Sequence, residues 1–327
     1  MKVKALFLGA LMFSLLVSPA SAAKVLRLAG NIQPEHSSSR AMEIFKTKLA
    51  EYSKGELTAE VFPGLQLGGA AENVDQVRNG TIFATWLTIG YLSRTVPELE
   101  AVSIPFIFPD REAAFRVMDG KVGGLLNERL GEKGFQALGY MEVGARNVTN
   151  NIRPLKSVED FKGLKIRLQP NQTHIATFEA LGASPIAMDV KEVYQALQQG
   201  VIDGQENPFA LIRASRYNEV QKYLSDTSHF FDFVIVAASK KQYDSFSEEE
   251  RTAIEKAMAE AVAWQRQTAV TEDAESLKFL VDSGMQFDPI SPEVRAVLRE
   301  KTKAVIDQVK AKVGDELVNA VLAEIAK

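Results

Sequence analysis

The sequence contains no cysteine among its 327 residues, and it has only three histidines and two tryptophans. Without cysteine, disulfides, thiolate metal ligands and a cysteine nucleophile are all excluded. The histidines do not stand at spacings typical of a metal site. The motifs of zinc proteases, serine hydrolases, P-loop NTPases and dinucleotide-binding enzymes are also missing. We therefore expect neither catalytic residues, nor a metal site, nor a cofactor.

An excess of positive charge is missing as well. The formal net charge is −4 at pH 7, from 38 Lys and Arg against 42 Asp and Glu. Because a protein that binds phosphate groups needs a basic face, we do not expect nucleic acid as a partner.

The N-terminus carries the three parts of a cleavable signal peptide, which we predict for residues 1–22. Lys2 and Lys4 are positive, residues 5–17 are apolar, and residues 20–22 read Ala-Ser-Ala. The apolar run is shorter than the roughly 20 residues of a membrane span, although a retained anchor is the alternative. We expect the rest of the chain to be exported and free in the periplasm.

Strand and helix signals alternate along the remaining sequence, which favours an α/β fold with a mostly parallel sheet. Strands are predicted at 25–29, 57–62, 81–89, 137–143, 164–169 and 233–238, separated by helices. The pattern recurs in both halves of the chain. It predicts a molecule of two α/β domains with the shape of a clam.

The longest helical signal begins at the capping box formed by Ser247 and Glu250 and ends before Gly284. About 35 residues rising 1.5 Å each would span roughly 50 Å. That length exceeds the width of a small domain. The segment is therefore either one helix that crosses both domains or two helices with a break.

Arg167 is the first candidate for a binding residue. It lies near the carboxyl end of the predicted strand 164–169, which is where open α/β sheets bind ligands. Its planar guanidinium matches a carboxylate in two parallel hydrogen bonds. The alternative is a solvated strand face, which Lys165 and Gln169 would share.

Two further polar residues are candidates beside Arg167. Arg146 follows the predicted strand 137–143 and could supply a second cation, or it could be a surface charge. Asn207 is predicted, with Gln205 and Glu206, in a tight turn after a strand. Because Pro208 keeps its backbone extended, Asn207 could point into a cleft, or it could bond its own turn.

Aromatic and imidazole side chains complete the set of candidates. Trp86 lies in a predicted apolar strand, where it could form a cleft wall that stacks on ligand carbons or belong to the core. His229 could be a polar pocket residue or a hydrogen-bonded core residue. His36 is predicted in a loop that could touch the ligand.

Several separated blocks of sequence are shared with one family. They are Q-L-G-G at 66–69, S-I-P-F-I-F at 103–108, G-A-R-N-V-T-N-N-I-R-P-L at 144–155, and G-L-K-I-R, L-G-A-S-P, E-V-Y-Q-A-L-Q-Q-G and V-I-D-G-Q-E-N-P within 163–208. In these blocks the chain resembles the periplasmic solute receptors of TRAP (tripartite ATP-independent periplasmic) transporters, the DctP-type binding proteins. The resemblance extends over essentially the whole chain after the signal peptide.

The resemblance implies a two-domain clamshell of the periplasmic-binding-protein type (type II) with one long helix spanning both domains. Residues 24–144 and 233–272 would form domain I, and residues 145–232 and 273–327 domain II, with the ligand in the cleft. It implies that Arg167 is the principal carboxylate clamp, that Arg146 assists, and that Asn207 holds the ligand or the clamp. The closed receptor would be a monomer that delivers an organic acid to the small and large membrane subunits of a TRAP permease.

The chain departs from this pattern at positions that select the substrate. Ala70 and Thr88 are uncharged where the sialic-acid receptors carry acidic residues, whereas Asn31 matches a polar contact position of that branch. Gln169 replaces the proline common after the strand arginine. The sequence therefore favours a uronate, an aldonate or a C4-dicarboxylate over an amino-bearing acid. The predicted ligand-binding residues are Arg167, Arg146, Asn207, Asn31, Trp86, Gln169, His229, Thr88 and His36.

Three other interpretations stay open from the sequence. Trp86 and Phe230 favour a receptor for a more apolar acid, such as an aromatic or branched keto acid. A periplasmic sugar-acid enzyme would need a catalytic constellation that the sequence does not offer. A ligand-loaded sensor that docks on a signalling receptor would have the same binding site.

Overall fold

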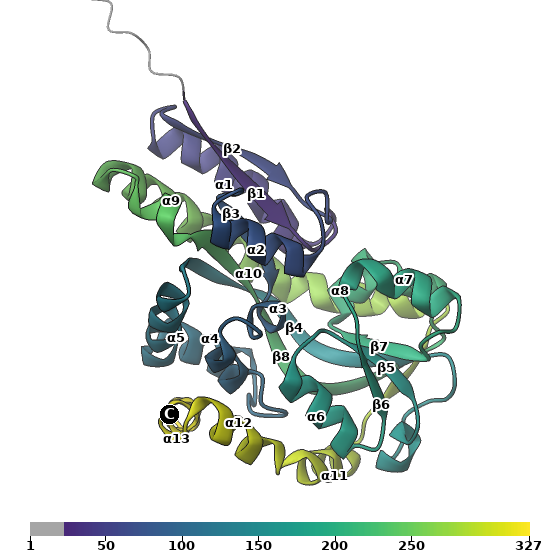
Figure 1. Ribbon diagram of the computed structural model, residues 1–327. Coiled ribbons are helices and arrows are strands. Elements are labelled where there is room, and N and C mark those ends of the chain that lie inside the picture. The colour runs from purple at the N-terminus through teal and green to yellow at the C-terminus, as the bar shows by residue number, and fades with distance from the viewer. Residues whose placement is uncertain (1–22) are drawn as a thin grey trace, which may run out of the picture.

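The computed structural model describes residues 23–327, so the predicted signal peptide lies outside the described residues. These residues form an α/β fold around one nine-stranded sheet with the order β2-β1-β3-β8-β4-β7-β5-β6, and β9 pairs with β8 (Figure 1). The strands are β1 (Lys24–Gly30), β2 (Leu57–Phe62), β3 (Ala84–Thr88), β4 (Phe135–Asn150), β5 (Lys165–Leu168), β6 (Ser184–Ala187), β7 (Gly204–Asn207), β8 (Tyr223–Ser239) and β9 (Gln286–Pro289).

The α-helices are α1 (Ser37–Tyr52), α2 (Ala70–Asn79), α3 (Ile89–Leu92), α4 (Arg111–Asp119), α5 (Lys121–Glu132), α6 (Gln172–Ala180), α7 (Val190–Gln198), α8 (Phe209–Ala214), α9 (Lys240–Asp244), α10 (Glu248–Asp282), α11 (Pro292–Thr302), α12 (Val305–Val313) and α13 (Asp315–Ile325). Short 3₁₀ helices are η1 (Pro97–Val102), η2 (Val158–Phe161) and η3 (Tyr217–Glu219). We call β1–β3 with their helices the first half, and β5–β7 with theirs the second half.

The two longest strands, β4 and β8, join the two halves. They have 16 and 17 residues and pair with each other in antiparallel fashion along most of their length. At one end β8 pairs with β3 of the first half, and at the other β4 pairs with β7 of the second half. The chain therefore crosses between the halves within continuous strands.

The structure refines one prediction about the sheet and corrects another. Five of the eight strand pairs are parallel, but the sheet is mixed, because the pairs β3–β8, β8–β4 and β4–β7 in its middle are antiparallel. Parallel pairing is found at its two sides and between β8 and β9. Gln205, Glu206 and Asn207 belong to strand β7 and not to a turn, because this segment pairs with β4 on one side and β5 on the other.

Buried apolar side chains lie on both faces of the first half of the sheet. Along Phe233–Ala238 of β8, alternate side chains enter two different apolar clusters. Helices α1 and α10 cover one face, and α2, α4 and α5 cover the other. Burial on both faces explains why this strand is a continuous apolar run in the sequence.

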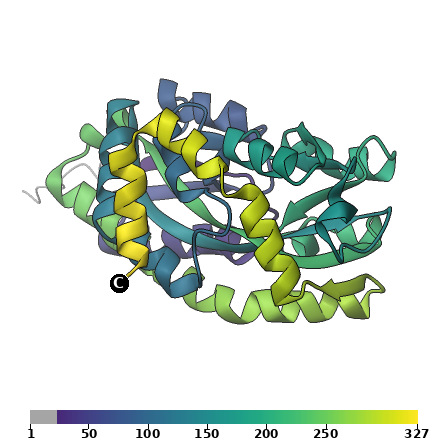
Figure 2. The ribbon, with the colours of Figure 1, turned by 90° about the horizontal axis from the view of Figure 1, so that it is seen from below.

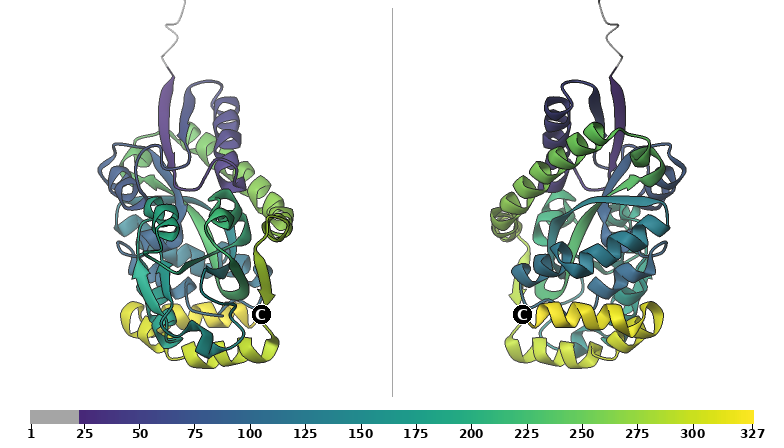
Figure 3. Two further views of the ribbon diagram at one scale, coloured as in Figure 1. Left: turned by 90° about the vertical axis from the view of Figure 1, so that its right-hand side faces the viewer. Right: turned by 90° about the vertical axis from the view of Figure 1, so that its left-hand side faces the viewer.

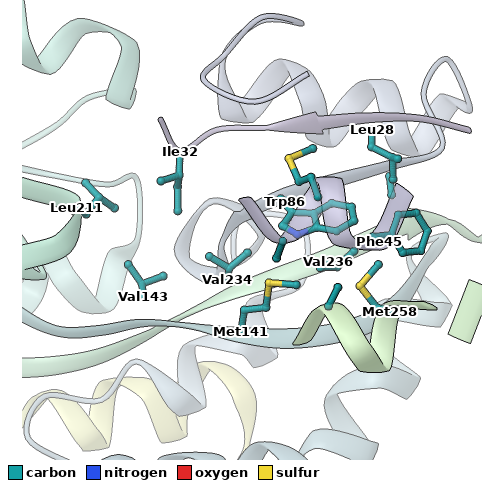
Figure 4. Packing of buried hydrophobic residues seen from close by; sticks show 14 of the residues in the cluster. Leu28, Ile32, Phe45, Trp86, Met141, Val143, Leu211, Val234, Val236 and Met258 are labelled. Carbon is teal, nitrogen blue, oxygen red and sulfur yellow. The ribbon is translucent and has the colours of Figure 1, made fainter. Parts of the chain in front are cut away.

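Trp86 of β3 lies in the first of these clusters. Its ring centroid is 5.8 Å from that of Phe45, and Met141, Val236 and Met258 lie around it (Figure 4). Only 2% of Trp86 is exposed. Trp86 is therefore a core residue packed between the sheet, α1 and α10.

The long helical signal forms a single helix, α10, of 35 residues. Its N-terminus has the predicted capping box, in which Ser247 accepts a hydrogen bond from the Glu250 backbone N–H. The helix packs against α1 of the first half and α8 of the second, and Figure 2 shows it in light green along one side of the molecule. The prediction of one helix spanning both halves is confirmed.

The C-terminal helices also contact both halves. Helix α11 packs on α6 and η2, whereas α12 and α13 reach η1, α4 and α5. Figure 3 shows them in yellow at the end of the molecule opposite β1 and β2. An ion pair of 2.8 Å between Lys312 and the buried Glu100 fixes α12 to η1. The tail therefore starts on the second half and ends on the first.

Candidate functional site

A cavity lies where the carboxyl ends of parallel strands from both halves meet. It is lined by Asn31, Ile32, Gln33, Thr88, Tyr91, Arg146, Arg167, Gln169, Val190, Asn207, Leu211 and Ser215. Most of these residues stand at, or a few positions beyond, the ends of β1, β3, β5, β6 and β7. This is the edge at which open α/β sheets bind ligands.

Arg167 lines this site as the penultimate residue of β5, and 2% of its surface is exposed. Its Nε donates to the Met188 carbonyl at 2.9 Å, and its Nη2 donates to the same oxygen and to the Tyr91 hydroxyl, both at 2.7 Å. These bonds fix the plane of the guanidinium. They leave the N–H groups of Nη1 without a partner among residues 23–327.

The charge of Arg167 is not neutralised within the described part of the chain. No carboxylate of residues 23–327 lies within 4.0 Å of its nitrogens. A buried charge is costly unless an opposite charge and hydrogen bonds compensate for it. The arrangement around Arg167 is therefore suited to an anion that comes from outside the chain.

Arg146 of β4 has the opposite surroundings, although it lines the same cavity. Its Nε lies 2.5 Å from a Glu206 carboxylate oxygen, its Nη1 lies 2.7 Å from Asp232, and its Nη2 donates to Glu206 and to the Asn207 side-chain oxygen at 2.8 Å. Both carboxylates are buried. Two carboxylates of the chain therefore already neutralise the second predicted cation.

The protonation states around Arg146 follow from burial and from this ion cluster. Burial disfavours the Glu206 carboxylate, but Arg146 and His229 outweigh burial and hold the pKa of Glu206 well below its usual range. For Asp232 burial prevails over Arg146 and raises the pKa. Burial also lowers the pKa of His229 and lowers that of His174 to about 3, so both imidazoles are neutral at pH 7.

His229 supports Glu206 from behind the cavity. Its Nε2 lies 3.0 Å from a Glu206 oxygen, and its Nδ1 lies 2.8 Å from the Thr227 hydroxyl. Since a carboxylate only accepts, Nε2 carries the proton and Thr227 donates to Nδ1. His229 does not line the cavity and acts on it through Glu206 and Arg146.

Gln169 connects the two halves next to the ion cluster of Arg146, Glu206 and Asp232. Its side-chain oxygen accepts from the Thr88 hydroxyl at 2.7 Å, and its nitrogen donates to Asp232 at 3.1 Å. The same nitrogen lies 3.5 Å from Nδ1 of His174, whose ring stacks on Phe230 with centroids 4.0 Å apart. Gln169 and Thr88 therefore belong to the cavity wall and also join the halves.

Two asparagines present amide groups to the cavity. Asn207 donates to Gln205 at 2.5 Å and accepts from Arg146, so its orientation is fixed. Asn31 donates to Asn73 at 2.9 Å, while its own side-chain oxygen is buried without a partner among the described residues. This oxygen is an acceptor suited to a ligand hydroxyl.

The structure thus brings together six of the nine predicted site residues: Arg167, Arg146, Asn207, Asn31, Gln169 and Thr88. Trp86 lies in the core and His229 behind the cavity, as described above. His36 is buried at the start of α1, where Nδ1 accepts from the Ser38 backbone N–H, and it lines a separate groove beside α8 and α10.

Six further residues line the cavity that were not among the predicted site residues. Tyr91, Gln33 and Ser215 supply polar groups, and Ile32, Val190 and Leu211 supply aliphatic ones. Tyr91 lies three residues beyond the carboxyl end of β3. The rule that ligands bind at the carboxyl ends of strands could therefore have pointed to it. The other residues stand in loops or on short helices, where the sequence has no periodicity that shows which side chain faces a cavity.

No group of three or more His, Cys, Asp or Glu residues within 23–327 could hold a metal ion. Over the same residues, no helix has both the length and the apolar character needed to cross a membrane.

The sequence matches a known family over residues 28–312, the family described as bacterial extracellular solute-binding protein, family 7 (DctP). The 2,3-diketo-L-gulonate-binding periplasmic protein YiaO of Escherichia coli K12 is 34% identical over 265 residues, which cover 81% of each chain. The C4-dicarboxylate-binding periplasmic protein DctP of Rhodobacter capsulatus is 31% identical over 98% of this chain and 97% of that protein.

A solved structure is also similar along most of its length. The sugar acid binding protein DctPAm of Advenella mimigardefordensis, in complex with galactonate, has a TM-score of 0.91 and 30% identity to this chain. The match covers 93% of this chain and 98% of DctPAm.

Proposed function

Since the chain belongs to the DctP family of bacterial extracellular solute-binding proteins, we propose that it captures a small hydroxylated organic acid on Arg167 and delivers it to a TRAP permease. The members of this family are substrate-binding transport proteins and not enzymes. The proposed ligand is a sugar acid, such as a uronate or an aldonate, with a C4-dicarboxylate as the other acid of suitable size.

The state of Arg167 carries this proposal. Its guanidinium is buried, its plane is fixed by Met188 and Tyr91, and no carboxylate among residues 23–327 neutralises it. A carboxylate from a ligand would supply the missing charge and accept from Nη1. Hydrogen bonds to charged groups contribute roughly 1.5–3 kcal/mol each, which is enough to dominate the affinity of a small ligand.

The rest of the cavity favours a hydroxylated acid with one carboxylate. Asn31, Gln33, Thr88, Asn207 and Ser215 supply amides and hydroxyls that suit a chain of ligand hydroxyl groups. A dicarboxylate would need a second cation, and the other arginine of the cavity, Arg146, is already neutralised by Glu206 and Asp232. For this reason we rank sugar acids above C4-dicarboxylates.

A more apolar acid is the second candidate. Ile32, Val190 and Leu211 give the cavity an aliphatic side, which favours a branched keto acid. Trp86 and Phe230, which suggested aromatic acids in the sequence, lie outside the cavity lining. A competition assay with pairs of acids that do and do not carry hydroxyls separates the two candidates.

Closure of two domains around the ligand is part of the proposal. Contacts between the halves surround the cavity: Tyr91 accepts from the Val190 backbone N–H at 3.0 Å, and Glu72 pairs with Lys191 at 3.2 Å. We propose that residues 24–144 and 233–272 move against residues 145–232, with β4, β8, α10 and the C-terminal helices α11–α13, which pack on both groups, as the connections. The closed form would be recognised, as a periplasmic monomer, by the membrane subunits of the permease.

A thermal-shift screen tests the proposal. Protein stripped of ligand by unfolding and refolding is mixed with uronates, aldonates, C4-dicarboxylates and keto acids, each beside a neutral analogue without the carboxylate. A ligand at a thousandfold excess over Kd stabilises the folded state by about 4 kcal/mol. We expect large shifts for one group of acids and none for the neutral analogues, and equal shifts with both would contradict the clamp.

The same screen with Arg167→Lys addresses the clamp residue. Lysine keeps the positive charge but lacks the planar fork and cannot hold the bonds to Met188 and Tyr91 together. We expect a folded protein whose calorimetric affinity for the selected acid falls by roughly 10- to 150-fold, as for the loss of one hydrogen bond to a charged group. Unchanged affinity would remove Arg167 from the binding site.

A further inference from the structure

We infer that Tyr91 is a second carboxylate-binding residue, whose hydroxyl donates to the same ligand carboxylate that Arg167 holds. This inference rests on the proposed function, because it assigns a partner to the ligand carboxylate at the same site. It is carried by the hydrogen bonds of the two side chains. These bonds show which donors are already in use.

The donors on one edge of the Arg167 guanidinium are already used in hydrogen bonds within the protein. Nε and Nη2 both donate to the Met188 carbonyl, and the second N–H of Nη2 is directed to the Tyr91 oxygen. An ideal pair of parallel bonds to a ligand carboxylate would need two free nitrogens on one edge. Only Nη1 is free among the bonds that the described residues make, so Arg167 alone holds one carboxylate oxygen well and the other poorly.

Tyr91 has the complementary arrangement. Its oxygen accepts from Arg167 Nη2 at 2.7 Å and from the Val190 backbone N–H at 3.0 Å. Both lone pairs of the oxygen are thereby in use, and the O–H group has no acceptor among residues 23–327. Tyr91 is 6% exposed and lines the cavity beside Arg167. The hydroxyl proton is therefore a buried donor directed away from two N–H groups and available to a carboxylate.

The protonation state and position of Tyr91 fit this role. Burial raises the pKa of Tyr91 despite the nearby Arg167, so the hydroxyl keeps its proton at neutral pH. Tyr91 lies in α3, whose neighbouring residue Gly90 approaches Gln169 so closely that an added Cβ would lie 2.5 Å from that side chain. The close approach sets α3 against the second half and places Tyr91 next to β5.

A consequence is that both halves of the protein contribute a donor to the site that binds the ligand carboxylate. Arg167 belongs to β5, whereas Tyr91 follows β3. One ligand carboxylate would accept from both and would hold the halves together. Acids should therefore gain affinity from closure that alcohols of the same shape do not.

The test compares Tyr91→Phe with Arg167→Lys by calorimetry, using the acid that raises the melting temperature most in the panel and D-galactonate. Tyr140→Phe is the matched control, since its hydroxyl donates to Asn127 and does not line the cavity. We expect Tyr91→Phe to lose roughly 10- to 150-fold in affinity, as for one hydrogen bond to a charged group, and the control to bind like the wild type.

A second variant, which keeps the shape of the side chain, distinguishes donation by Tyr91 to a ligand from a purely structural role of Tyr91. Fluorotyrosine at position 91 makes the O–H a stronger donor and the oxygen a weaker acceptor. If Tyr91 donates to the carboxylate, acids bind more tightly to this variant. If Tyr91 only accepts from Arg167 and Val190, binding is weaker or unchanged, and the inference is overturned.

The two proposals fail in different ways. Wild-type affinity for Tyr91→Phe together with lost affinity for Arg167→Lys overturns the role of Tyr91 and keeps the clamp. Retained affinity in Arg167→Lys overturns the clamp itself. If no acid of the panel binds the wild-type protein, both proposals fall.

Discussion

Arg146 and Arg167 line the same cavity and are both almost completely buried, with 1% and 2% of their surface exposed, but their surroundings are opposite. Arg146 contacts two carboxylates of the chain, Glu206 and Asp232. Arg167 contacts a carbonyl and a hydroxyl, and no carboxylate of residues 23–327 reaches it. The two arginines therefore differ in the origin of the negative charge that accompanies them.

Under the proposed function, this difference separates a structural cation, Arg146, from the cation that binds the ligand, Arg167. The charge of Arg146 is neutralised during folding, when β4, β7 and β8 come together, so Arg146 holds three strands in place. The charge of Arg167 stays available after folding. Burial alone would not distinguish the two residues, whereas their counter-charges do.

The largest expected effect comes from Arg146→Met, which leaves Glu206 and Asp232 buried without their partner. Breaking a buried ion pair in this way costs about 3–5 kcal/mol of folding stability. Urea unfolding of the ligand-free protein measures the loss. The control is Arg78→Met, which removes an exposed pair with Asp75 and should cost less than about 1 kcal/mol. Equal losses in both variants would contradict the structural role of Arg146.

Arg167→Met should have the reverse pattern. It removes a buried charge that the described chain does not neutralise, so the ligand-free protein should be as stable as the wild type or more stable. The stabilisation by a saturating acid, about 4 kcal/mol at a thousandfold excess over Kd, should disappear. Urea unfolding with and without the acid reports both quantities. A large loss of stability without ligand would make Arg167 a second structural cation.

The smallest expected effect is the pH dependence contributed by the imidazole beside the two arginines. Burial lowers the pKa of His174 to about 3 in the folded protein, compared with about 6.5 in the unfolded chain. The unfolded chain therefore binds more protons in this interval. The stability that His174 contributes is fully present above pH 6.5 and is lost as the pH falls toward 3.

The slope of this loss approaches about 1.4 kcal/mol per pH unit for one proton. His36 and His229, whose pKa values burial also lowers, add to it. Urea unfolding between pH 7.5 and 4.5 measures the slope. In His174→Gln the slope should decrease by up to about 1.4 kcal/mol per pH unit, which corresponds to one proton. An unchanged slope in that variant would show that His174 is protonated without cost in the folded state.

Much of the fold was predictable because its signals are local. The capping box at Ser247 and the absence of Gly and Pro until Gly284 predict α10 from neighbouring residues alone. The apolar parts of β4 and β8 were also predicted. Their other parts were not, because residues 146–150 and 223–232 are mostly polar and are stabilised by buried hydrogen bonds to distant segments.

The site shows the same limit. The position of Arg167 at the end of a strand is a local property and could be predicted. The partners of Arg146 could not, because Glu206 and Asp232 come from two other strands, 60 and 86 residues away along the chain. Trp86 was a candidate for the cleft because periodicity in a strand buried on both faces does not tell which side chain is near a ligand.

The long crossing strands have a consequence for how such receptors diversify. Because β4 and β8 run through both halves as continuous strands, neither half is a segment that can be cut out and exchanged as a module. A recombination event between the halves would have to divide two paired strands and α10 at once. New ligand preferences in this architecture should therefore arise by point substitution around the cavity, with the strand framework inherited as one piece.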